Sequence, residues 1–153
     1  MNHSATSTQI RQHVQRQLIA LEEEKQAFLD AVFPAFGDKR TQAEQIVTRY
    51  SSCIRELLNL PDDQLCKVIL IGSQVRITYL EDHDMDSFTI VYPQHAEPNE
   101  NRISFLSPMG RQLLTATIGS ILTIDTPAGT IDIRIDKVTF TAEDIEGGCQ
   151  HER

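Results

Sequence analysis

The spacing of apolar residues changes once along this chain, at the stretch Leu60-Pro61-Asp62-Asp63. Before this stretch, apolar residues recur every three or four positions, which is the period of an amphipathic helix. After it they recur at every second position, which is the period of a half-buried strand. A chain of 153 residues with this division predicts an α+β protein, with helices in its first half and a sheet in its second.

The first half predicts two helices that pack against each other in antiparallel orientation. The first seam advances in steps of four and three residues: Val14, Leu18, Leu21, Lys25, Phe28 and Val32. The second seam has a similar spacing: Ala43, Ile46, Tyr50, Cys53, Leu57 and Leu60. Pro34 ends the first helix and Gly37 permits a tight reversal. We therefore expect an antiparallel coiled coil over residues 8–60, preceded by a flexible N-terminus at 1–7.

The length of these seams favours a hairpin that projects from the sheet and buries its own core. In that arrangement the first helix runs without a break as far as Pro34. The alternative is that both helices lie flat against the later domain.

The second half, residues 67–141, predicts a twisted antiparallel sheet with one short helix across its concave face. Strands are expected at 75–79, 88–92, 103–105, 121–126 and 131–140. The apolar positions change from odd to even numbers after Asp136, which predicts a β-bulge near that residue. The short helix begins at Ser107-Pro108, because Ser107 can accept from unpaired N–H groups and Pro108 has no N–H of its own. Residues 142–153 form a tail.

Charge and cysteine usage exclude several classes of protein. The formal net charge of -8 and the sequence pI of about 5.0 argue against broad binding of nucleic acids or anionic membranes through charge alone. The N-terminal residues lack the apolar stretch of a signal peptide, and the longest apolar run, at 68–71, is too short to span a bilayer. The three cysteines lack CxxC spacing and predict reduced thiols in a cytoplasmic protein, with Cys53 buried.

No catalytic or metal-binding constellation stands out, so we expect no enzyme activity, no metal and no cofactor. The acidic loop after the first strand invites a calcium interpretation, because Asp82, Asp84 and Asp86 match the first ligand positions of an EF-hand loop. However, Ser87 stands where that loop needs glycine, and Pro93 stands where it needs glutamate. A solvated hairpin loop is therefore the better interpretation.

Several short motifs of the second half follow one another in a fixed order: Gly72-Ser73, Tyr92-Pro93, Ile103-Ser104, the block SPMGRQLL at 107–114, and Thr126-Pro127-x-Gly129. In this order and with these gaps, residues 68–140 resemble the C-terminal domain of the Gre-factor family of bacterial transcription elongation factors. The resemblance implies an FKBP-like fold and an N-terminal antiparallel coiled coil. Leu106, Thr115 and Ser120 depart from the family pattern. The short hairpin is similar to that of the regulator of nucleoside diphosphate kinase, a relative of the family.

The resemblance implies binding to RNA polymerase and regulation of transcription elongation. In the family, the C-terminal domain docks on the rim of the polymerase secondary channel and the coiled coil enters that channel. By similarity, the polymerase-binding residues are Ser107, Pro108, Met109 and Arg111. Contact with nascent RNA or DNA is expected to be indirect, within the elongation complex.

The tip of the hairpin bears on mechanism. In relatives that stimulate transcript cleavage, two tip acids help hold a second Mg²⁺, in a motif that reads roughly Gly-Asp-x-x-Glu-Asn-Ala-Glu. The tip residues here are Asp38, Lys39, Arg40 and Glu44, and Thr41 stands at the second acid. A hydroxyl brings no charge to the ion, and Lys39 and Arg40 should repel it. We therefore expect no stimulation of cleavage; the alternative role of Asp38 is to cap the second helix.

Two other function classes stay open. The fold name suggests a peptidyl-prolyl isomerase, but a fold does not determine function, and the chain has no Trp and only three Tyr to line a proline pocket. The other class is an adaptor with the same fold and a partner other than polymerase. A pull-down from lysate separates these interpretations.

Overall fold

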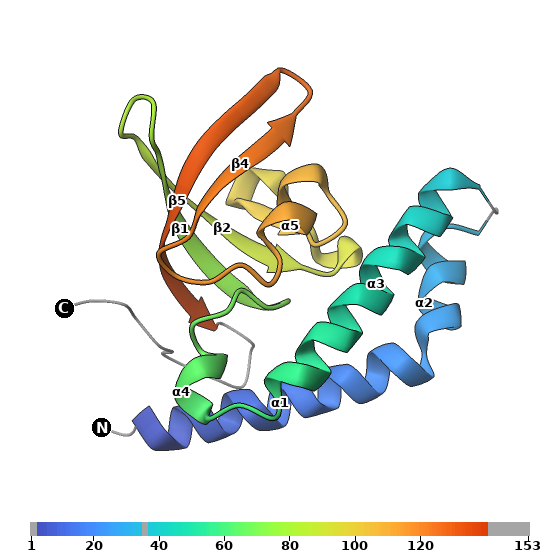
Figure 1. Ribbon diagram of the computed structural model, residues 1–153. Coiled ribbons are helices and arrows are strands. Elements are labelled where there is room, and N and C mark those ends of the chain that lie inside the picture. The colour runs from blue at the N-terminus through green and yellow to red at the C-terminus, as the bar shows by residue number, and fades with distance from the viewer. Residues whose placement is uncertain (1–2, 35–36, 141–153) are drawn as a thin grey trace.

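The computed structural model describes residues 3–34 and 37–140 of the chain (Figure 1). Among these residues, the helices before the sheet are α1 (His3–Glu23), α2 (Lys25–Val32), α3 (Asp38–Leu57) and α4 (Asp62–Leu65). The sheet domain comprises β1 (Ser73–Tyr79), β2 (Met85–Val91), β3 (Arg102–Ser104), α5 (Pro108–Leu113), β4 (Ile121–Thr126) and β5 (Gly129–Phe140). Helix α1 begins at His3 rather than at residue 8, and the tail predicted at 142–153 lies outside the described residues. None of the described helices combines the length and apolar character needed to cross a membrane.

The first helix is broken, so the prediction of one uninterrupted helix was wrong. The break lies at Glu24, a bend with φ -112° and ψ 16° between α1 and α2. Figure 1 shows the chain changing direction here, so that α1 lies below the sheet domain and α2 rises beside α3. Phe28 of α2 then stacks on Phe105 of the sheet domain, with ring centroids 6.0 Å apart. Phe28 was predicted to lie in the two-helix seam, but its ring packs against the sheet domain, and this aromatic contact favours the bend.

Helix α3 buries a narrower stripe than the one predicted. Its buried positions include residues spaced three and four apart: Arg40, Ala43, Val47, Tyr50 and Ile54. Cys53, which was expected to be buried, is a half-buried free thiol beside this stripe. Cys66 is disulfide-bonded, so the prediction of reduced thiols was wrong at this residue.

The described strands form one curled sheet in the order β3-β2-β1-β5-β4. Strand β1 pairs antiparallel with β2 and β5, and β4 pairs antiparallel with β5, so the acidic loop lies at a hairpin turn as predicted. Strand β3 pairs parallel with β2, so the prediction of a fully antiparallel sheet was wrong at this edge. The short turns Pro93–His95 and Pro98–Glu100 form a crossover that brings the chain back before β3 begins, and parallel pairing requires such a crossover.

The β-bulge predicted near Asp136 is confirmed. Arg76 of β1 pairs with Lys137, whereas the next residue, Ile77, pairs with Ile135. Asp136 is therefore the extra residue on β5. This insertion explains why the buried positions of β5 change from odd to even numbers.

The carboxylate of Asp136 anchors this bulge to the neighbouring strand. It accepts hydrogen bonds from Thr78 Oγ1 of β1 and from Arg134 Nε, the latter at 2.8 Å. Burial raises the pKa of Asp136, but these two donors and the nearby arginine charge outweigh burial and hold the pKa below its usual value. The side chain is therefore ionised at neutral pH.

Helix α5 closes the open side of the curled sheet, because it contacts both edge strands, β3 and β4. Leu113 is fully buried, and Leu114 is 8% exposed. They join a core of sheet residues that includes Val75, Ile77 and Ile133. The short helix predicted from Ser107-Pro108 is confirmed.

The helices and the sheet share one hydrophobic core, so the expectation of a hairpin with a separate core was wrong. Ile10 and Val14 of α1 and Val47 of α3 belong to the same buried cluster as Val75 and Ile77 of the sheet. The boundaries of the coiled coil at 8–60 and of the later domain at 67–141 stay predictions.

A buried hydrogen-bond network joins three segments inside this core. Tyr50 of α3 donates its hydroxyl hydrogen to Gln17 Oε1 of α1, and its oxygen accepts from the backbone N–H of Ile71 at 2.9 Å. Gln17 Nε2 donates to the Ile71 carbonyl at 3.2 Å. Tyr50 is 2% exposed, and burial raises its pKa well above the usual value, so the hydroxyl remains a donor.

Tyr50→Phe should lower the free energy of unfolding by about 1–3 kcal/mol, because two buried polar groups each lose a partner. Because the core is continuous, helix and sheet signals should be lost in one transition. Urea unfolding followed by far-UV circular dichroism and by amide NMR signals of the sheet measures both. The matched control is Tyr79→Phe, whose hydroxyl donates to Asp86 at a half-buried site. Equal costs for the two variants, or two separate transitions, would contradict the prediction.

Candidate functional site

The turn at the start of α5 is fixed by hydrogen bonds of Ser107 and exposes the next residue, Pro108. Ser107 Oγ accepts from the Gly110 N–H at 3.0 Å and donates to the Ser104 carbonyl at 2.7 Å. Pro108 is the first residue of the helix, a position whose N–H has no partner within a helix, so the lack of an N–H in proline costs no hydrogen bond. Pro108 is exposed. The turn therefore presents Pro108 on a rigid base.

Gly110 allows α5 to lie against the backbone just after β3. A Cβ at this position would be 2.1 Å from the Ser104 carbonyl oxygen and 2.9 Å from Ser107 Oγ. The first of these atoms belongs to the backbone and cannot move aside easily. No side chain fits here, so the glycine sets how closely the helix approaches the sheet.

The residues predicted to bind a partner lie in this one turn but differ in exposure. Pro108 and Arg111 are exposed, whereas Ser107 and Met109 are partly buried. Met109 packs against the hydrophobic core. Pro108 and Arg111 are therefore the residues that the turn offers to a partner, and their contact with one stays a prediction.

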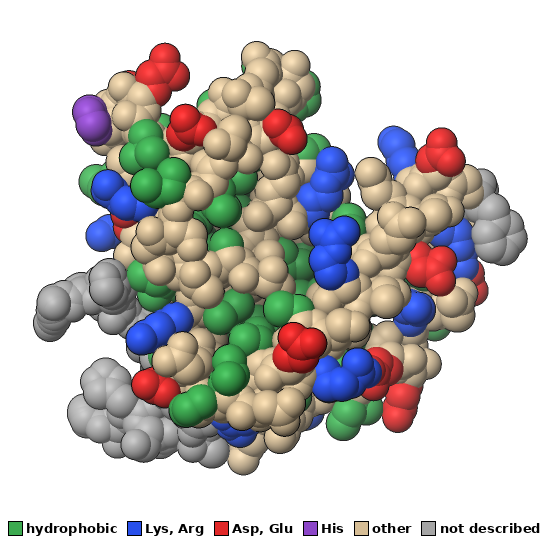
Figure 2. All heavy atoms as spheres, viewed as in Figure 1, with side chains coloured by type: hydrophobic (Ala, Val, Ile, Leu, Met, Phe, Trp, Pro, Cys, Tyr) green, Lys and Arg blue, Asp and Glu red, His purple; other side chains and the backbone are tan. Residues whose placement is uncertain are grey.

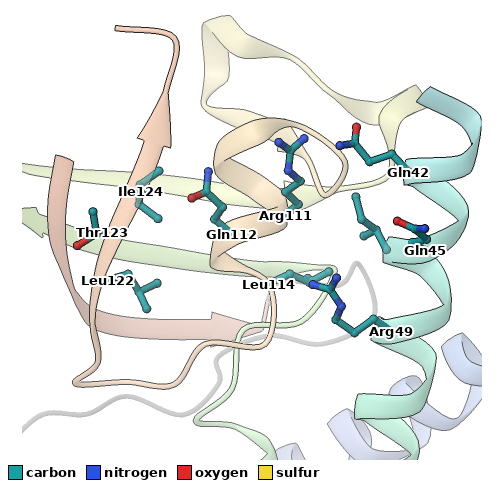
Figure 3. A pocket seen from close by; sticks show the side chains of 10 residues that line it. Gln42, Gln45, Arg49, Arg111, Gln112, Leu114, Leu122, Thr123 and Ile124 are labelled. Atoms are coloured by element: carbon teal, nitrogen blue, oxygen red, sulfur yellow. The ribbon is translucent and has the colours of Figure 1, made fainter. Parts of the chain in front are cut away.

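A groove of about 500 Å³ separates α5 from the hairpin (Figure 3). Helix α3 forms one wall with Gln42, Gln45 and Arg49, and the other wall includes Arg111 of α5 and Thr123 of β4. Figure 3 shows Gln42 and Arg49 extending from α3 toward α5. Figure 2 shows basic side chains where the sheet domain and the hairpin meet.

Gln112 blocks part of the free edge of β4 beside this groove. Its Nε2 donates to the Asp125 carbonyl at 3.0 Å, and its Oε1 accepts from the Asp125 N–H at 2.9 Å. These are the two hydrogen bonds that a neighbouring strand would make. The edge of β4 is therefore closed to strand addition at this residue.

The sequence reasoning missed the wall of the groove on α3. Gln42, Gln45 and Arg49 are spaced three and four residues apart, so they form a polar row on one face of the helix. That regular row beside an apolar seam was the available signal. What the row faces depends on how the hairpin packs against the sheet, which no local pattern specifies.

At the hairpin tip, Asp38 and Lys39 are exposed at the start of α3. Gly37 occupies the N-cap position, so Asp38 lies in the first turn and does not cap the helix. Glu44 lies 4.0 Å from Lys25 Nζ and so faces α2. Within residues 3–34 and 37–140, no group of three or more His, Cys, Asp or Glu side chains is arranged to hold a metal ion.

Arg40 closes the hairpin from inside, so the prediction that it adds charge to the exposed tip was wrong. It is 6% exposed, and its guanidinium donates to the Phe33 carbonyl and to Asp30 Oδ1, both at 2.8 Å. A third bond reaches Gln26 Oε1 at 3.2 Å. A buried charge needs such partners. The sequence carries a signal for this orientation, because Arg40 lies three residues before Ala43 and so falls on the same buried face of α3.

Comparisons with known proteins show which family this chain is similar to. A family model described as the C-terminal domain of the transcription elongation factors GreA and GreB matches residues 64–140. Transcription elongation factor GreA of Oceanobacillus iheyensis is 35% identical over 107 residues, which cover 69% of this chain and 68% of that protein. GreA of Bacillus cereus is 32% identical over 107 residues, with the same coverage. The crystal structure of GreA factor homolog 1 of Thermus thermophilus aligns with 86% of this chain and 93% of that chain, at 22% identity and a TM-score of 0.44.

Gly110→Ala should lower the free energy of unfolding by about 1–3 kcal/mol, because the added methyl group meets the Ser104 backbone. Arg111→Ala, one residue further on an exposed position, should change it by less than about 0.5 kcal/mol. Thermal unfolding followed by circular dichroism compares the two. Equal effects would show that α5 shifts away from Ser104 at no cost.

Proposed function

The chain belongs to the GreA/GreB family of transcription elongation factors, and we propose that it binds RNA polymerase through its sheet domain and acts at the secondary channel without stimulating transcript cleavage. The observation that carries the proposal is the turn that begins α5. Pro108 and Arg111 are exposed there, on a base held by the hydrogen bonds of Ser107. The block that forms this turn is also the strongest motif of the family resemblance.

The physical character of this turn suits protein recognition. A rigid surface binds with a smaller loss of conformational entropy than a segment that must become ordered. Pro108 has a fixed backbone, and the side chain of Ser107 is held by two hydrogen bonds. Arginine is among the residues that contribute most to binding at protein interfaces, which favours Arg111 as an anchor.

The composition of the tip supports the absence of cleavage stimulation. Asp38 is the only exposed acid at the start of α3 that matches the cleavage motif, because Thr41 stands at the second acid. Glu44 lies near Lys25 rather than free at the tip. Exposed Lys39 adds positive charge there, whereas the charge of Arg40 is compensated by Asp30. One carboxylate beside a lysine is a poor ligand set for Mg²⁺.

The reach of the hairpin supports the same conclusion. Helix α2 has eight residues, which corresponds to a rise of about 12 Å. Phe28, in the middle of α2, still contacts Phe105 and Tyr92 of the sheet domain. Only a short part of the hairpin therefore extends beyond the sheet domain toward a polymerase channel.

Binding to purified core RNA polymerase tests the docking surface. Pro108→Asp and Arg111→Glu should each weaken binding at least about tenfold, since interface anchors usually contribute that much or more. Pro108→Asp preserves the helix, because an acid in the first turn is favourable. Pro98→Asp is the matched control, because Pro98 is also exposed at the start of a short helical turn. Unchanged affinity in both test variants would remove the docking assignment.

A pull-down from lysate with the full chain separates polymerase from other partners. Recovery of polymerase that is lost with Pro108→Asp supports the proposal. Recovery of another protein without polymerase would favour the adaptor function instead.

A backtracked elongation complex with Mg²⁺ tests the mechanistic part. The protein should not accelerate release of short 3′ RNA fragments, because the tip lacks the second carboxylate. Thr41→Glu places an acid at that position. This variant tests whether the missing second carboxylate accounts for the lack of cleavage stimulation. Rapid cleavage by the wild type, abolished by Asp38→Ala, would show that the proposal is wrong about cleavage.

A further inference from the structure

The groove between α3 and α5 carries positive charge on an otherwise acidic protein. Arg49 lies on its α3 wall and Arg111 on its α5 wall, and no Asp or Glu lines it. Among the residues that the structure describes, neither arginine lies within salt-bridge distance of a carboxylate. The same two arginines also line an adjoining cavity of about 160 Å³. Two guanidinium groups, both on exposed residues, therefore line one groove in a chain whose formal net charge is -8.

The rest of the groove suits a small polar molecule. Gln42 and Gln45 offer amide donors and acceptors, and Ile46, Leu114 and Leu122 offer apolar surface. The volume of about 500 Å³ is within the usual range for small-molecule sites. A ligand with an anionic end and a larger, partly apolar body would use both kinds of surface.

Three kinds of extended occupant fit this groove less well. An added β-strand would need the free edge of β4, which Gln112 blocks at Asp125. Single-stranded nucleic acid usually stacks its bases on aromatic side chains, and this groove is lined by none among the described residues. An acidic peptide spreads its charges along a backbone, whereas only two cationic side chains line this groove among the described residues. One phosphate carries up to about two charges on a single group and matches two arginines.

We propose that this groove binds a phosphate-bearing small molecule of nucleotide size, with phosphate oxygens held between Arg49 and Arg111. The glutamine amides and the aliphatic side chains contact the remainder of the ligand. Because its walls come from α3 and from the sheet domain, such a ligand ties the hairpin to the sheet and stabilises the folded chain in proportion to its occupancy. Arg111 also belongs to the proposed docking turn, but this proposal does not rest on polymerase binding, because its test uses the protein alone.

Isothermal titration calorimetry with ADP and GDP, on the full chain at low ionic strength, tests this proposal. Adenosine, inorganic pyrophosphate and hexaglutamate are the comparison probes. Arg49→Gln and Arg111→Gln should each weaken nucleotide binding at least about tenfold, as expected for loss of a charge-assisted hydrogen bond. Arg16→Gln, an exposed position on α1 away from the groove, is the matched control and should leave binding unchanged. Amide NMR shifts of Gln45 and Thr123 on addition of GDP locate the ligand.

The expected result is saturable binding of ADP or GDP, at least tenfold tighter than that of adenosine and pyrophosphate. Absence of saturable binding at millimolar nucleotide would overturn the proposal. So would an equal loss of affinity in Arg16→Gln, or nucleotide-dependent shifts confined to residues outside the groove. Tighter binding of hexaglutamate than of either nucleotide would overturn the proposal in favour of an acidic polypeptide. Binding of pyrophosphate as tightly as nucleotide would overturn the claim that the ligand is of nucleotide size.

Discussion

The hydrogen bonds of Tyr50 connect the helical hairpin to the sheet domain, and the position of the groove between α3 and α5 depends on them. One hydroxyl group serves α1 through Gln17 and the sheet domain through the backbone of Ile71. Gln17 closes the triangle by donating to the Ile71 carbonyl. Because all three groups are buried, each needs its partners, and the network permits one relative position of the three segments.

The groove follows from this constraint. Helix α3 is held beside the sheet domain, so the polar row of Gln42, Gln45 and Arg49 faces α5 and β4 across the groove (Figure 3). Phe28 contributes from the other side of the hairpin, where it stacks on Phe105. A hairpin that projects away on its own separate core would leave Arg49 far from Arg111. Continuity of the hydrophobic core therefore creates an interaction surface that neither half of the chain has alone.

Residues that look alike in sequence divide between structural and exposed roles. Arg40 and Lys39 are adjacent and equally charged, but Arg40 is buried against Asp30 and Phe33, and Lys39 is exposed. In the α5 turn, the hydroxyl of Ser107 is occupied by two hydrogen bonds that hold the exposed Pro108 in place. In both motifs a residue with a structural role lies next to an exposed residue and helps to fix the backbone of that neighbour.

The sequence by itself determined the elements that depend on local rules: the helical and strand periods, the helix start at Ser107-Pro108, and the bulge at Asp136. These follow from alternation of burial along one segment and from backbone groups within a few residues. Only the tertiary structure decided the break at Glu24, the parallel pairing of β3, the inward orientation of Arg40, and the meeting of α3 with α5. Each of these depends on contacts between segments distant in sequence, whose packing and hydrogen bonds outweigh local preference, so that a periodic pattern along one segment does not specify them.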